Sequence, residues 1–142
     1  MEHSKEKILA GCAKMCKNTL METLKIEFTD VTNKKLTARM PVTPRVHQPD
    51  GVLHGGATVA LAESVGSAAA FIFLDAANVG IRGIEIAANH VKSVREGYVY
   101  AHATLLHQGR SIQLWQIRIE NEGGELVSMV KLTTMALFNK KQ

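Results

Sequence analysis

Apolar side chains recur with two different periods along the first part of the chain. Residues 4–17 carry them at helical spacing, which predicts a short helix. From Leu24 the period changes to two, and the same alternation returns over residues 36–42, so two strands are predicted. The polar sequence "TNKK" (32–35) between them is typical of a hairpin loop. The side of the helix that should be buried carries Ile8, Cys12, Met15 and Cys16.

The middle of the chain is a long apolar segment with one charge. Residues 56–74 are apolar or small, and Glu63 is the charged side chain among them. The segment is just long enough to span a bilayer. A carboxylate near the centre of a membrane costs about 3 kcal/mol, however, and no basic cluster flanks the segment. We therefore predict a buried helix of a soluble protein that is covered on most of its sides.

The chain after Arg82 predicts four further strands. The glycine turns "QGR" (108–110) and "NEGG" (121–124) join the last three of them. This order predicts an α+β fold, in which one antiparallel sheet ends in a four-stranded meander and carries the long helix on its concave face. A single sheet covers such a helix incompletely, so dimerisation is also expected. One face of the first of these strands should carry Ile84, Ile86, Ala88 and His90.

Composition and charge narrow the function classes. The 142 residues suit a single domain that spans the whole chain, 1–142. The formal charge of +4 favours an anionic ligand only weakly because the basic residues are scattered, and 5% aromatic residues without a basic stripe argue against nucleic acid. The apolar residues that follow "MEHSKEK" are too few for a secretory signal, so we expect a cytosolic protein. The six histidines show no ligand spacing, so no metal site is expected.

Glu63 is the first candidate for chemistry. A lone Glu in an apolar helix either points to solvent at an edge, pairs with a buried arginine, or acts on a ligand. Small neighbours at helical spacing leave room beside this carboxylate, and Ser67, one turn on, offers a hydroxyl. This arrangement favours a general base. The expected neighbours are Val59, Ala60, Gly66, Ser67 and Ala70.

The start of the long helix is the second candidate. The sequence "VLHGG" (52–56) contains no Ser, Thr, Asp or Asn to cap the first amides. Gly55 and Gly56 let another molecule approach the backbone, and free N–H groups at a helix start can stabilise an oxyanion. The alternative is that glycine merely permits a tight turn there.

The spacing between the two candidates predicts how they work together. Gly55 precedes Glu63 by about 12 Å along an ideal helix. A base and an oxyanion donor must both lie about 3 Å from the reacting group. One chain cannot easily supply both, so we predict a site shared across a dimer, with the helix start of one subunit facing Glu63 of the other.

The segment "GVLHGGATVALAESVGSAAA" (51–70) resembles the helix motif of hotdog-fold acyl-coenzyme A thioesterases. The similar groups act on 1,4-dihydroxy-2-naphthoyl-CoA and 4-hydroxybenzoyl-CoA, or proofread enterobactin synthesis. The resemblance continues through "GIEIAANHVKSVREG" (83–97) and "HQGRS" (107–111) and covers about residues 20–138. It implies an antiparallel sheet wrapped around one long central helix, with dimers of such subunits assembled into a homotetramer.

The resemblance also implies roles for the candidate residues. Glu63 matches the catalytic carboxylate, which acts as nucleophile or as base toward water. The Gly55 amide matches the donor that polarises the thioester carbonyl, assisted by Gln48 and His54 of the partner chain. Ser67 matches a residue that orients the water or the carboxylate.

The implied substrate is an acyl-CoA, so coenzyme A is part of the substrate and no cofactor is expected. From its strand position alone His90 is a core histidine, whereas the resemblance places it beside the acyl pocket. The anionic phosphates of coenzyme A would suit basic residues near strand ends, although a solvated basic surface explains each of these residues equally well. The expected substrate-binding residues are His90, Gly56, Lys92, Arg95, Gly109, Arg110 and Ser111.

Three alternatives remain beside an acyl-CoA thioesterase with an aromatic or hydroxyaryl substrate. The thiol could belong to an acyl or aryl carrier protein instead of coenzyme A. A hotdog hydratase or dehydratase could use His54 together with Glu63. A non-catalytic module could bind an acyl thioester without cleaving it. Asp50 departs from the apolar or aromatic residue of several similar proteins and is expected to change the pocket mouth.

Overall fold

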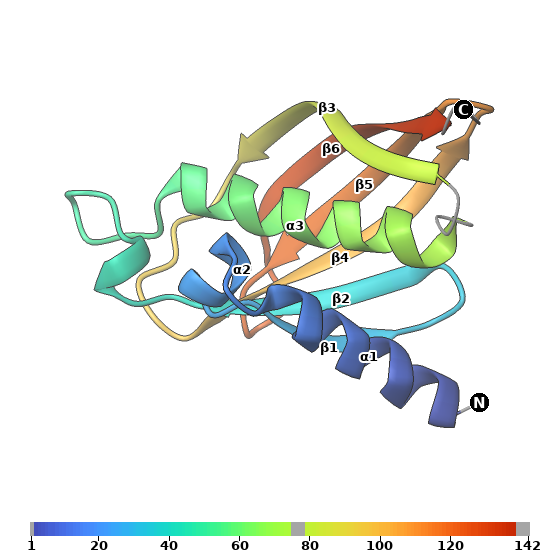
Figure 1. Ribbon diagram of the computed structural model, residues 1–142. Helices are drawn as coiled ribbons and strands as arrows, with labels where there is room; N and C mark the ends of the chain where they lie inside the picture. Colours follow the sequence, from blue (N-terminus) through green and yellow to red (C-terminus); the bar gives the residue numbers. More distant parts are fainter. Residues whose placement is uncertain (1, 75–78, 139–142) are drawn as a thin grey trace.

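The computed structural model describes residues 2–74 and 79–138, in which one sheet curls around a long helix (Figure 1). The helix, α3, lies across one face of the sheet, and α1 packs beside β1 at one edge. The predicted architecture, an antiparallel sheet with the apolar helix on its concave face, is confirmed. The elements are α1 (Glu2–Cys16), α2 (Leu20–Thr23), β1 (Glu27–Val31), β2 (Lys35–Pro41), η1 (Pro44–Val46), α3 (Gly55–Phe73), β3 (Val79–His90), β4 (Tyr98–Gln108), β5 (Ile112–Glu120) and β6 (Leu126–Phe138).

The order of the strands differs from the predicted meander. The six strands lie in the order β1-β2-β4-β5-β6-β3, so β3 pairs with β6 and not with β4. After β3 the chain first stays beside β6, where Val91 donates its N–H to the carbonyl of Val127. It then reaches the segment before α3, where the carbonyl of Val94 accepts from the N–H of Leu53. The meander prediction was wrong for β3 because alternation indicates which face of a strand is buried, and the neighbouring strand depends on the path of the connection.

The core lies between α3 and the inward side chains of the sheet. Trp115 is fully buried, and its indole N–H donates to Thr134 Oγ1 at 2.9 Å. Close approach of the helix depends on Gly66, where a Cβ atom would lie 2.5 Å from Leu132 Cδ2 and 3.3 Å from Ile117 Cδ1. Adding a side chain there would push α3 away from the sheet.

Among the described residues, α3 is the one helix with the length and composition of a membrane span. It is packed into the sheet, however, as the sequence predicted. Its buried residues are Thr58, Leu61, Ala62, Val65, Gly66, Ala68, Ala69 and Ala70.

The N-terminal helix α1 buries two cysteine thiols against β1. Cys12 and Cys16 are both buried and free, as the helical spacing suggests, and burial together with the neighbouring Cys16 raises the pKa of Cys12 to about 11. Lys5 forms an ion pair with Asp30 of β1, which holds the first turns of α1 against the sheet. Met15 was expected on the buried side, but it is 44% exposed and borders a cavity described below.

Two short segments depart from their predicted alternation. Leu24 caps the unexpected helix α2 instead of beginning a strand, and β1 starts at Glu27. In β3, a bulge between Gly83 and Glu85 shifts the register, so Ile84 is exposed while Ile86 packs on the core. A bulge inserts one residue and moves the following side chains to the other face, which period-two alternation cannot anticipate.

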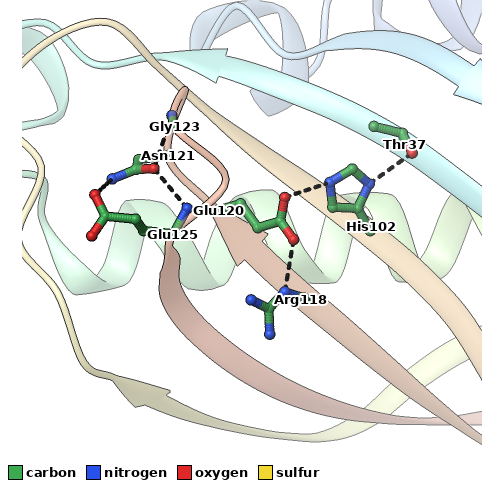
Figure 2. A network of polar contacts seen from close by, with 7 residues as sticks. All are labelled: Thr37, His102, Arg118, Glu120, Asn121, Gly123 and Glu125. Atoms are coloured by element: carbon green, nitrogen blue, oxygen red, sulfur yellow. Dashed lines mark hydrogen bonds and ion pairs between the residues drawn. The ribbon is translucent and has the colours of Figure 1, made fainter.

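A polar network crosses the face of the sheet that is turned away from α3 (Figure 2). His102 Nδ1 lies 3.0 Å from Thr37 Oγ1, and His102 Nε2 lies 3.4 Å from Glu120 Oε2. Arg118 donates from Nε to Glu120 Oε1 at 2.7 Å. This hydrogen bond is the main cause that lowers the pKa of Glu120, with the charge of His102 adding to it. The network therefore ties three neighbouring strands together.

Replacing Glu120 with glutamine is expected to lower the free energy of unfolding by about 1 kcal/mol at pH 7. Because the pKa of Glu120 is lowered in the folded chain, its stabilisation is present above the unfolded pKa and is lost as the pH falls through the folded pKa. Urea unfolding of the wild type and the variant from about pH 7 down to pH 2 measures this difference, which should shrink toward zero. A difference that did not change with pH would contradict the assigned role of the charge.

The same figure shows the hairpin turn between β5 and β6, which the sequence "NEGG" predicted. Asn121 Oδ1 accepts from the backbone N–H groups of Gly123 and Glu125 at 3.0 and 2.9 Å. Gly124 adopts φ of +79°, a conformation that favours glycine.

Candidate functional site

The start of α3 is capped, which corrects one prediction. His54 is the N-cap residue, and its Nδ1 accepts a hydrogen bond from the N–H of Gly56 at 2.8 Å. The imidazole thus takes the role usually played by Ser, Thr, Asp or Asn, and in neutral His54 the ring proton is left on Nε2. The N–H of Gly55 has no acceptor within residues 2–74 and 79–138. Of the two glycine amides, only that of Gly55 is therefore free to meet a ligand.

His90, at the end of β3, lies directly against Gly55. A Cβ atom on Gly55 would lie 2.9 Å from His90 Nε2, so the glycine makes room for the imidazole. His90 Nδ1 is 2.9 Å from the hydroxyl of Ser128, a fully buried residue on β6. Ser128 also lies within hydrogen-bonding distance of the carbonyl of Asn89, at 3.2 Å. His90 is exposed at the helix start and is not a core histidine.

A cavity of about 330 Å³ opens at this point, and we call it the helix-start cavity. Gln48 lies in its wall and donates from Nε2 to Asp50 Oδ1 at 2.7 Å, so Asp50 holds the amide of Gln48 in place. The cavity combines an amide, an imidazole and an ammonium group with a free backbone N–H. Its polar lining includes Gln48, Gly55, Thr58, His90, Lys92 and Ser93.

Glu63 borders a second, larger cavity of about 650 Å³, which we call the Glu63 cavity. Glu63 and Ser67 lie in its wall, and both side chains are partly exposed. The rest of the lining comes from the end of α1, from α2 with the residue before it, from other positions on α3, and from the start of β3. The lining residues include Met15, Leu20, Glu63, Ser67, Phe71 and Arg82.

The immediate surroundings of Glu63 match the prediction in part. Ala60 and Ser67 line the Glu63 cavity as expected, whereas Gly66 and Ala70 are buried against the sheet. Ser64 also lines the cavity, but its hydroxyl donates to the carbonyl of Ala60 at 2.6 Å. Ser67 is therefore the hydroxyl on this face of α3 that forms no hydrogen bond within the described residues.

The two cavities have no lining residue in common. Within one chain, Gly55 and Glu63 thus face separate spaces on α3, as their spacing along the helix predicts. Each cavity contains half of the groups that hydrolysis of a thioester needs: a backbone donor in one and a carboxylate in the other.

The basic residues expected to contact coenzyme A divide into two groups. Lys92 lines the helix-start cavity and forms an ion pair with Glu125 at 3.2 Å. Arg95 is exposed near the same end of α3, where its Nη1 would lie 3.8 Å from a Cβ on Gly51. Lys92 and Arg95 therefore stand near Gly55.

The turn at residues 109–111 lies at the other end of the sheet. Gly109 donates its N–H to the carbonyl of Ile112, and Ser111 accepts from Ala136, near the end of β6. Arg110 is exposed in this turn. One chain does not bring these residues together with Lys92 and Arg95. No group of three or more His, Cys, Asp or Glu suited to a metal occurs within the part of the chain that the structure describes.

Sequence reasoning missed two residues that contact the candidate groups. Ser128 supports His90, and Gly83 lies against the Glu63 carboxylate, where a Cβ atom would come within 2.9 Å of Oε2. Both contacts depend on cross-strand register and on the bulge in β3. A serine and a glycine in strand sequences carry no periodic signal that would reveal them.

Comparison with known proteins places this arrangement in a family. Residues 50–128 match the model of the thioesterase superfamily. A 1,4-dihydroxy-2-naphthoyl-CoA hydrolase of Escherichia coli is 43% identical over 123 residues, which cover 87% of this chain and 90% of that protein. A proofreading thioesterase of Cronobacter turicensis is 41% identical over 119 residues, covering 84% of this chain and 86% of the relative.

A solved structure shows the same fold. A thioesterase of Pseudomonas aeruginosa, determined as a mutant, superposes with a TM-score of 0.90 and 37% identity. The superposition covers 92% of this chain and 94% of that one. The two chains therefore share the fold over most of their length.

Proposed function

Because this chain belongs to the thioesterase superfamily and is a thioester hydrolase, we propose that it cleaves a hydroxyaryl acyl-CoA to the free acid and coenzyme A. The observation that carries the proposal is the pair of half-sites on α3, with the free Gly55 N–H in one cavity and Glu63 in the other. The relatives are named as hydrolases and thioesterases, which favours hydrolysis over a hydratase and over a binding module.

In the proposed reaction, water activated by Glu63, or the Glu63 carboxylate itself, attacks the thioester carbonyl carbon. The carbonyl oxygen gains negative charge, and the Gly55 N–H stabilises it. The C–S bond then breaks and the thiolate leaves. A thiol has a pKa of about 8.5, so the leaving group needs little help from a general acid. If Glu63 attacks directly, water hydrolyses the resulting anhydride in a second step.

We further propose that two subunits form each site. β3 is an edge strand that pairs only with β6 among the described strands, so its other edge is open to a second chain. Phe71, Ile84 and Val91 are exposed apolar residues on α3, on β3 and just after it. A partner at this edge would cover them and bring its helix start to Glu63. The resemblance to hotdog-fold thioesterases implies that two such dimers form a tetramer.

The acyl group is proposed to occupy the Glu63 cavity. Met15, Leu20 and Phe71 offer apolar surface for a ring there, and each is more than 40% exposed in the single chain. Ser67 and Arg82 lie in the same wall and could contact polar substituents of the ring. The Escherichia coli relative named for 1,4-dihydroxy-2-naphthoyl-CoA supports a hydroxyaryl substrate.

A thiol-release assay across a set of thioesters tests this proposal. The set should contain 1,4-dihydroxy-2-naphthoyl-CoA, 4-hydroxybenzoyl-CoA, benzoyl-CoA and several linear acyl-CoA compounds. The highest kcat/KM is expected for a hydroxyaryl compound. Preference for linear acyl chains would overturn the acyl assignment, and no thiol release from any compound would overturn the function.

We also propose that coenzyme A, and not a carrier protein, is the thiol that carries the acyl group. The carrier protein is the alternative because one relative is named as a proofreading thioesterase. The same hydroxyaryl group on a phosphopantetheinylated carrier protein is the matched comparison. We expect the coenzyme A thioester to react faster, since Lys92 and Arg95 are exposed near Gly55 and can contact its phosphates. A higher kcat/KM with the carrier protein would assign the carrier as the substrate.

A further inference from the structure

The Glu63 carboxylate fills the place that a side chain of Gly83 would take. A Cβ atom built on Gly83 would lie 2.9 Å from Glu63 Oε2 and 3.5 Å from Glu63 Cδ. Real Cβ atoms do not come so close to an oxygen that stays in place. The carboxylate position and the absence of a side chain at Gly83 are therefore linked.

Leu132 closes the other side of the same space. Its Cδ1 lies 3.5 Å from the position of a Cβ on Gly83, and its Cδ2 faces Gly66 of α3. Leu132 is fully buried in a close-packed core, so it has little freedom to move. A methyl group at Gly83 would consequently displace the partly exposed Glu63 and leave Leu132 in place.

The bulge in β3 accounts for this contact. Gly83 pairs with the buried Thr134 of β6, and the register shifts between Gly83 and Glu85. Gly83 is thus the last residue before the shift, where the strand bends beside α3. Glycine in a strand often marks a site where another group approaches the backbone closely. Here that group is the carboxylate.

We propose that Gly83 is a positioning residue for Glu63: its missing side chain and the adjoining bulge set the place of the carboxylate for attack on the thioester or on water. This inference rests on the proposed function, since it assumes that Glu63 acts on the substrate. It predicts that adding one methyl group at Gly83 impairs the chemical step and leaves the fold intact.

Gly83→Ala is the test variant, and Gly11→Ala is the control for adding a methyl group away from the site. Gly11 lies on α1 and lines neither cavity, and a Cβ there would meet nothing within 4 Å. A displacement of about 1 Å can reduce catalysis by about 100-fold. We expect Gly83→Ala to lower kcat at least tenfold at nearly unchanged KM, and Gly11→Ala to keep the kcat of the wild type. Thermal unfolding and the oligomeric state of Gly83→Ala should match the wild type.

The double variant Gly83→Ala with Glu63→Gln separates positioning from a general structural defect. If Gly83 acts through the carboxylate, Gly83→Ala has no further effect on the residual activity of Glu63→Gln. A further multiplicative loss, or a fall in kcat that follows a loss of folded protein, would overturn the proposal. Wild-type kcat in Gly83→Ala would overturn it as well. The proposed function fails separately, if Glu63→Gln itself keeps full activity.

Discussion

Glu63→Gln is expected to lower kcat for thioester hydrolysis by about 10²–10⁴-fold, because the amide can neither accept a proton from water nor attack the carbonyl. KM should change little, since the side chain keeps its size and its place in the wall of the Glu63 cavity. Thiol release under saturating substrate measures the effect. The fold should be unaffected, because Glu63 forms no ion pair within the described residues.

Glu85→Gln provides the control for a nearby carboxylate. Glu85 lies on β3 two residues from Gly83, is exposed, and is 4.0 Å from Lys131 across the strand pair. The Glu85→Gln substitution removes one negative charge close to the site, and residue 85 does not line the Glu63 cavity. Its kcat should stay within about twofold of the wild type, since an exposed pair contributes little. Equal kcat in the wild type and Glu63→Gln would refute the role of Glu63.

Removing the Gly55 N–H is expected to lower kcat by about 10²–10³-fold, the usual effect of losing one oxyanion donor. Gly55→Pro removes this hydrogen without breaking the helix, because proline is well tolerated at the first helical position. His54, the preceding residue, has φ of −69° and ψ of 130°, which a following proline accepts. The assay is again kcat with a hydroxyaryl acyl-CoA.

Gly55→Ala is the control for Gly55→Pro, because any Cβ at residue 55 would lie 2.9 Å from His90 Nε2. Both variants displace the imidazole, but only Gly55→Pro also removes the N–H. The ratio of their kcat values therefore isolates the donor. If the alanine and proline variants were equally active, the N–H would not be the oxyanion donor.

The fold could be predicted where periodicity decides it. The apolar run from 56 to 74 and the alternation over 36–42 gave a buried helix and a strand at nearly the observed places. The position of β3 beside β6 could not be predicted, because the path of residues 91–97 is set by hydrogen bonds to Val127 and Leu53. Those contacts are long-range and leave no pattern in the sequence.

The relative positions of two site groups could be predicted because both groups lie on one helix. The distance between Gly55 and Glu63 follows from their spacing on α3, and the structure gives them separate cavities. The cap by His54 was missed because histidine is not a usual N-cap residue. Its Nδ1 nevertheless accepts from the N–H of Gly56, as the oxygen of a usual N-cap side chain would. The contact of Gly83 with Glu63 depends on the bulge in β3, which alternation does not reveal.

Mixing two inactive variants tests whether each site combines the helix start of one subunit with Glu63 of the other. Glu63→Gln and Gly55→Pro are unfolded together in equal amounts, refolded, and assayed for thiol release. Each variant treated alone serves as the control. In a twofold dimer, half of the dimers would be mixed, and each mixed dimer would carry one site with both groups intact. We therefore expect recovery of about a quarter of the wild-type activity. A mixture that stays as inactive as the separate variants, although mixed dimers have formed, would contradict it.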